Sequence, residues 1–124
     1  MKYSIDKQDR YSIFQLEEKN LNSVIAPQLK SEFVFLRNEG VKNLILDMEN
    51  LDYVDSSGLS SILTANRLWK DYGSFILTNI KSSSISNLLE ISKLTDILTI
   101  IPTLEEAVDY VFMEDIERDL SEEE

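Results

Sequence analysis

The chain has 124 residues, of which 23 are acidic and 12 are basic, and its formal net charge at pH 7 is −11. This length predicts one domain, and so acidic a surface repels nucleic acid phosphates and anionic lipids, so that we expect neither nucleic acid nor membrane as a partner. Because the chain has no cysteine and no histidine, a disulfide framework, a thiol nucleophile and the commonest metal ligand are excluded, and we expect no metal and no cofactor.

The first half of the chain predicts a hairpin, a helix and a buried strand. Residues 3–7 and 11–16 have the pattern of two strands joined by a short polar turn. Apolar residues at helical spacing then predict a helix that ends at Gly40, a typical residue just beyond a helix. Residues 43–48 contain a short apolar run, Leu44–Leu46, which is typical of a strand buried on both faces.

The second half of the chain alternates helices and strands. In order, the pattern predicts a helix over 57–71, a strand over 74–78, a short helix capped by 82–84, a strand over 97–101 and a final helix opened by the capping box Thr103–Glu106. Alternation of strands and helices after an initial hairpin implies an α/β domain. We expect a mixed, mostly parallel sheet begun by the hairpin, with about four helices.

The C-terminal segment is strongly acidic. Residues 114–124 hold seven acidic side chains and one arginine. Ile116 and Leu120 are its only large apolar residues, so composition predicts a disordered tail. We therefore expect a folded domain at 1–113 and a tail at 114–124, which either aids solubility or steers a basic partner.

Residues 55–59, Asp-Ser-Ser-Gly-Leu, stand where a polar loop gives way to the helical pattern. Side-chain oxygens of Asp and Ser cap the first unpaired amides of a helix, and a capping role alone explains these residues. Hydroxyls placed there also lie beside a helix N-terminus, which attracts negative charge and offers free N–H groups to a phosphate. Ser56 is therefore a candidate phosphoryl acceptor, with Ser57 as the second choice.

The succession of segments resembles the STAS domain of the bacterial anti-sigma factor antagonists. The resemblance covers about residues 1–112, and it is carried by segments 14–16, 44–47, 51–59, 75–77, 88–91 and 105–108. Asp-Ser-Ser-Gly-Leu at residues 55–59 is its most specific part. The resemblance implies a STAS-like single domain of the same α/β class, with the junction at the surface.

The resemblance also implies a function in transcription regulation. The unphosphorylated domain would bind a serine kinase that acts as an anti-sigma factor, and the kinase would phosphorylate Ser56 and so be released. A metal-dependent phosphatase of the PP2C type would restore the hydroxyl. Since loops and helix ends carry function, the expected contact residues are Asn22, Asp55, Ser56, Ser57, Gly58, Leu59 and Ser60.

The chain departs from the antagonist pattern in two places. Asn22 stands where many relatives carry an acidic residue, and it keeps capping ability without the charge. Ser60 and Ser61 replace the small apolar or glycine residues that often follow the motif. These changes leave the expected fold intact and bear on the details of the kinase contact.

Other functional classes fit the residues less well. A receiver domain needs a lysine after its fifth strand, and here that strand ends in Pro102. Ser56 has no histidine to activate it as a nucleophile, and the three glycines do not cluster into a phosphate loop, so we expect no enzyme. Two alternatives stay open: a STAS scaffold in a transport or signalling assembly, and a module that binds a small ligand or nucleotide.

The expected location is the cytoplasm. The N-terminal residues 1–7 lack the apolar stretch of a signal peptide. Further along the chain, no run approaches the roughly 18 apolar residues of a membrane-spanning helix.

Overall fold

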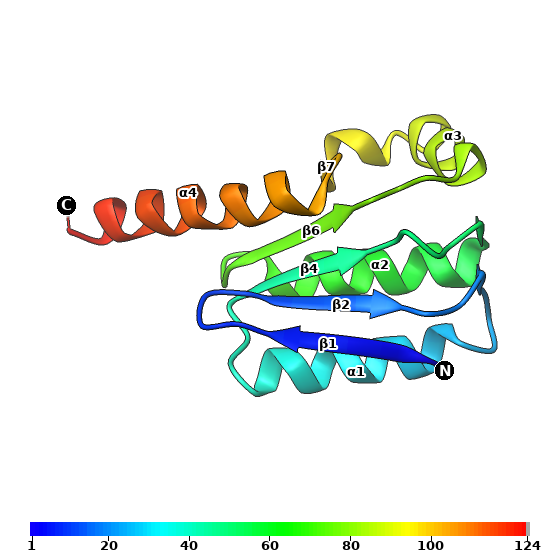
Figure 1. The fold of residues 1–124 in the computed structure, drawn as a ribbon, viewed down its shortest axis with the longest axis horizontal. Helices are drawn as coiled ribbons and strands as arrows, with labels where there is room; N and C mark the ends of the chain where they lie inside the picture. Colours follow the sequence, from blue (N-terminus) through cyan, green and yellow to red (C-terminus); the bar gives the residue numbers. More distant parts are fainter. Residues whose placement is uncertain (124) are drawn as a thin grey trace.

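The computed structural model describes residues 1–123 and contains a five-stranded sheet with helices on both faces (Figure 1). Its strands, in spatial order, are β1 (Tyr3–Lys7), β2 (Ser12–Leu16), β4 (Asn43–Asp47), β6 (Ser74–Thr78) and β7 (Thr99–Ile101). β1 runs antiparallel to β2, and every other neighbouring pair is parallel. The predicted mixed, mostly parallel sheet begun by a hairpin is therefore confirmed.

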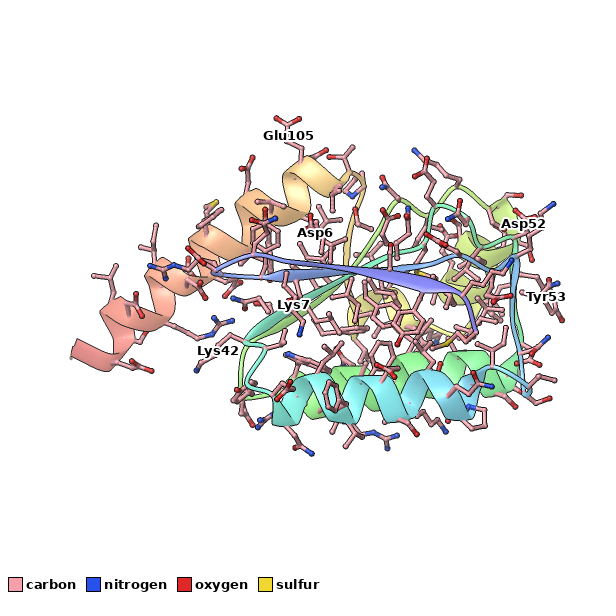
Figure 2. The ribbon with its side chains drawn as sticks, turned by 60° about the horizontal axis from the view of Figure 1, so that its bottom comes forward. Asp6, Lys7, Lys42, Asp52, Tyr53 and Glu105 are labelled. Carbon is pink, nitrogen blue, oxygen red and sulfur yellow. The ribbon has the colours of Figure 1, made fainter. Side chains whose placement is uncertain are left out.

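Four α-helices lie in the described part of the chain, as predicted: α1 (Ala26–Asn38), α2 (Ser56–Trp69), α3 (Ser83–Ile91) and α4 (Leu104–Glu123). Figure 2 shows α1 and α2 together beneath the sheet and α4 above it. A 3₁₀ helix at Leu94–Asp96 was not predicted, because three residues are too few to show a period. The chain that follows it joins the sheet only from Thr99, two residues later than expected.

Alternation along the strands divides the core between the two faces of the sheet. The larger cluster joins α1 and α2 to the side chains that point beneath the sheet, namely Phe14, Leu16, Leu44, Leu46, Phe75 and Leu77. On the other face, Ile45 and Ile76 pack with Ala107 and Val111 of α4. β4 and β6 are thus buried on both sides, which is why the three central residues of β4 are all apolar rather than alternating.

A second, two-stranded sheet joins two loops at one end of the molecule. It pairs β3 (Asn20–Leu21) with β5 (Tyr53–Val54) in parallel, and it was not predicted, because each strand has only two residues. The Asp55 N–H also donates to the carbonyl of Leu21 at 3.1 Å. This pairing fixes the loop before α1 beside the first turn of α2.

α4 corrects the prediction that residues 114–124 form a disordered tail. The helix continues without a break through this segment to Glu123, and Glu124 lies outside the described residues. The prediction depended on apolar burial, and Ile116 and Leu120 indeed remain more than half exposed. A different kind of contact holds the segment.

Polar side chains fasten the second half of α4 to the starts of two strands. Asn43, at the start of β4, donates from Nδ2 to Asp115 at 3.2 Å. Arg118 donates to Asp115 at 2.8 Å and to Ser74 Oγ, at the start of β6, also at 2.8 Å. Arg10 in the hairpin turn lies 3.6 Å from the Asp115 carboxylate. Since these partners lie far away in sequence, composition within the segment could not show them.

The polar network predicts how truncation affects stability. Deleting residues 114–124 removes Asp115 and Arg118, so we expect the free energy of unfolding to fall by about 1–2 kcal/mol. Deleting only residues 119–124 keeps both side chains, and we expect a change within about 0.5 kcal/mol. Urea denaturation of the two truncated proteins measures the difference. Equal stability of the two would show that the network does not hold the helix.

Candidate functional site

The Asp-Ser-Ser-Gly-Leu segment forms the start of α2, as predicted. Asp55 is the residue that caps the helix: its backbone is extended, and its Oδ1 accepts a hydrogen bond from the Gly58 N–H at 2.9 Å. The first hydrogen bond of the helix runs from Leu59 N–H to the Asp55 carbonyl. The amides of Ser56 and Ser57 precede that bond and have no acceptor within the helix. They are available to an anion at this end of the helix.

The two serines differ in accessibility. Ser56, the first helical residue, is exposed, whereas Ser57 is half-buried. A modifying enzyme must reach the hydroxyl that it modifies, so this difference favours Ser56 over Ser57 as the acceptor. Asp52 and Tyr53, labelled in Figure 2, mark the end of the molecule at which these serines lie.

Beside Ser56 lies an open hollow of about 330 Å³, called here the serine hollow. It is lined by residues from the turn before α1, the first turns of α1 and the start of α2, namely Ser23, Ala26, Pro27, Lys30, Ser56, Ser57 and Ser60. Lys30 donates from Nζ to Ser60 Oγ at 3.2 Å. The hollow therefore combines three hydroxyls of α2 with one positive charge supplied by α1.

Asn22 lies close to this site but is engaged locally. The β3–β5 pairing places Asn22 and Asp55 directly after two paired residues, Leu21 and Val54. The Asn22 Oδ1 accepts hydrogen bonds from the N–H groups of Val24 at 3.0 Å and of Ile25 at 3.4 Å. It thus caps the turn before α1, and the next residue along the chain, Ser23, lines the hollow in its place.

The remaining predicted residues do not line the hollow but pack the first turn of α2 against the rest of the domain. Gly58 is buried, and a Cβ built on it would overlap the carbonyl oxygen of Leu21. Leu59 is half-buried and packs against the larger core cluster. Of the predicted contact residues, the structure brings Ser56, Ser57 and Ser60 together around the hollow, while Asp55, Gly58 and Leu59 hold the helix in place.

Four residues of the hollow were not predicted from the sequence: Ser23, Ala26, Pro27 and Lys30. Their spacing of three, four and seven residues is that of one helix face. The predicted helix rests on its apolar face, which carries Leu29 and Phe33. Small residues followed by a lysine at this spacing on the neighbouring face are the signal in the sequence that indicates the hollow.

The described residues, 1–123, contain neither a candidate metal cluster nor a candidate membrane span. No three or more Asp or Glu side chains gather in an arrangement that could hold a metal ion. None of the helices in this range has the length and apolar character needed to cross a membrane.

Comparison with known proteins agrees with the fold. The STAS domain family model matches residues 2–107. BtrV of Bordetella bronchiseptica, described as a candidate anti-sigma factor antagonist, is 31% identical over 103 residues, which are 82% of this chain and 84% of that protein. The resemblance to this relative is therefore one of amino-acid sequence over most of both chains.

Solved structures of anti-sigma factor antagonists have the same fold. The antagonist from Mycobacterium paratuberculosis superposes with a TM-score of 0.80 at 16% identity, over 89% of this chain and 92% of that one. SpoIIAA in its unphosphorylated form gives a TM-score of 0.75 at 24% identity, over 89% and 96% of the two chains. Its phosphorylated form gives 0.69 at the same identity, over 89% and 99%. The predicted resemblance is confirmed: the chain belongs to the STAS domain family and has the fold of the anti-sigma factor antagonists.

Proposed function

We propose that this chain is an anti-sigma factor antagonist whose partner binding is switched by phosphorylation of Ser56. In its unphosphorylated form it binds a serine kinase that acts as an anti-sigma factor, and phosphate on Ser56 releases that kinase. A PP2C-type phosphatase restores the binding form. The observation that carries the proposal is the exposed Ser56 hydroxyl at the start of α2, beside the serine hollow.

The surroundings of Ser56 suit a phosphate. A phosphoserine adds a charge of about −1.5 to −2, and the free amides at the start of α2 offer it hydrogen bonds. Lys30, held at the rim of the hollow by Ser60, brings a positive charge to the same surface. SpoIIAA, which shares this fold, has been solved with and without phosphate, so the fold is compatible with the modification.

The alternative of a small-ligand or nucleotide site has less support at this position. Ligand pockets are typically about 300–1,000 Å³ and lined mainly by apolar and aromatic side chains. The serine hollow is at the lower end of this range, and five of its seven lining residues are serines or lysine. A shallow polar surface of this kind is better suited to contact with another protein. A permanent scaffold role would not require an exposed hydroxyl at Ser56.

The proposal is tested by the modification state of the natural protein. Intact mass of the protein purified from its own host should show a population that carries one phosphate, and peptide mapping should locate that phosphate on Ser56. A phosphate found only on Ser57 would move the switch by one residue. Absence of phosphate under every growth condition that alters sigma factor activity would contradict the switch.

The binding surface is tested by a bulky side chain at Ser60. Ser60→Tyr fills the serine hollow and displaces Lys30, so we expect affinity for the partner kinase to fall at least about tenfold. Asn38→Tyr places the same side chain on an exposed position at the other end of α1 and should leave affinity unchanged. Isothermal titration measures both affinities. If the two variants bind equally well, the interface lies elsewhere.

A further inference from the structure

The solvent-facing side of α4 carries an apolar stripe, defined here as Met113, Ile116 and Leu120. These side chains are 64%, 59% and 57% exposed. Their spacing of three and four residues places them on one side of the helix. A surface helix normally directs its apolar residues to the core and polar ones to solvent. Here the second half of α4 has the reverse arrangement, and nothing in the described part of the chain covers the stripe.

The stripe is presented by a helix in a fixed orientation. Figure 1 shows the second half of α4 extending past the starts of β4 and β6, and Figure 2 shows the same projection from a second direction. Asp115 and Arg118 lie on the side facing the sheet and hold the helix to Asn43 and Ser74. An element that is already ordered loses less entropy on binding than a free segment does. The arrangement therefore suits a docking surface.

Charge selects the kind of partner. Between Leu104 and Glu123 the helix has nine acidic residues and one basic residue, Arg118. Exposed carboxylates flank the stripe, among them Glu117 and Asp119, whereas Arg118 is already engaged by Asp115 and Ser74. A second copy of this chain would bring like charges together, and anionic lipid or nucleic acid would do the same. A partner that carries positive charge beside an apolar face avoids this repulsion and can also cover the stripe.

We infer that the α4 stripe and its acidic borders bind a basic amphipathic helix of another protein. Apolar anchors at such spacing are the usual contacts when one helix docks against another helix or groove. Three exposed anchors bury a small area, so the complex is of the weak, transient class. This surface is distinct from the proposed Ser56 switch. Asn43 and Ser74 begin their strands, whereas the serine hollow lies where β3 and β5 end; Figure 2 shows Lys42 and Asp52 at these opposite ends.

The test uses a synthetic helical peptide of about 18 residues, with leucine at helical spacing and lysine elsewhere. Fluorescence anisotropy at about 0.15 M salt measures its affinity for the full chain. We expect binding to the wild type, and at least about tenfold weaker binding to Ile116→Ser/Leu120→Ser. The matched control Ile91→Ser/Ile97→Ser removes two apolar side chains elsewhere that are at least as exposed, and it should bind like the wild type.

Charge reversal gives a second, independent pair of variants. Glu117→Lys/Asp119→Lys should weaken peptide binding, while Asp52→Lys/Asp96→Lys, with the same change in net charge away from α4, should weaken it much less. Ser56→Ala should bind the peptide like the wild type, so failure of the switch would leave this result unaffected. Absence of binding, or equal binding by every variant, would overturn the inference. Self-association in sedimentation that Ile116→Ser/Leu120→Ser abolishes would also overturn it, because the occupant would then be a second copy.

Discussion

Phosphorylation of Ser56 is expected to weaken binding of the partner kinase by roughly 30-fold to several thousandfold, at about 1.4 kcal/mol for each factor of ten. In the complex, the phosphate must lose its water or face acidic groups of the partner. Uncompensated charge at an interface commonly costs about 2–5 kcal/mol. Because Ser56 is exposed at the start of α2 beside the serine hollow, the added charge would lie within the proposed contact surface.

The same modification should barely change the fold. Within the domain, repulsion from the neighbouring Asp55 is opposed by the helix N-terminus, which is worth roughly 0.3–2 kcal/mol to a negative charge. Lys30 adds an attractive charge across the serine hollow. Because Ser56 is exposed, water and salt screen the remaining repulsion between the phosphate and Asp55. We therefore expect the denaturation midpoint of the phosphorylated protein to stay close to that of the unmodified one.

Two alanine variants separate the acceptor from its neighbour. Ser56→Ala should bind the kinase and take no phosphate, while Ser57→Ala should still be phosphorylated with Mg²⁺ and ATP. Phosphate incorporation and titration of the kinase against modified and unmodified protein give the two measurements. Equal phosphorylation of Ser56→Ala and wild type, or unchanged affinity after complete modification of Ser56, would contradict the switch.

Most of the fold could be predicted because local pattern and tertiary structure agree. β6 has the limits expected from its apolar run, 74–78. The first bond of the capping box is present: the Glu106 N–H donates to Thr103 Oγ1 at 3.2 Å. The Glu106 carboxylate reaches back to the Thr103 hydroxyl, which donates to Oε1 at 3.0 Å, rather than to the Thr103 N–H. Asp55 caps α2 as its residue type predicts. In each case a few neighbouring residues contain the whole physical reason.

What could not be predicted depends on residues that are distant in sequence. The β3–β5 pair has four residues in all, and only tertiary contact stabilises so short a ribbon. The serine hollow is formed by two helices, so neither helix alone indicates that Lys30 meets Ser60. The second half of α4 is held by Asn43 and Ser74, more than thirty residues away from it. Composition predicted disorder there because it counts apolar residues and not specific polar partners.

The packing around residue 58 explains why glycine stands at this position of the chain. A Cβ on residue 58 would overlap the carbonyl oxygen of Leu21 and would lie 2.7 Å from Leu21 Cγ and 3.0 Å from Val54 Cγ1. The first of these is a backbone atom of the β3–β5 ribbon, so it cannot turn away as a flexible side chain would. Glycine thus lets the first turn of α2 approach the ribbon closely.

Gly58→Ala is expected to lower the free energy of unfolding by about 1–2 kcal/mol. Overpacking of this kind typically costs about 1–3 kcal/mol and occasionally more, and because backbone must move here, the cost should exceed the gain of up to about 1 kcal/mol from replacing glycine with alanine in a helix. Ser57→Ala, one residue earlier in the same turn, meets no such backbone contact and should change stability by less than about 0.5 kcal/mol. Urea denaturation compares the two variants with the wild type. If Gly58→Ala proved as stable as Ser57→Ala, the close approach of α2 to the ribbon would not be what the glycine provides, and its place in the motif would have to come from contact with the partner.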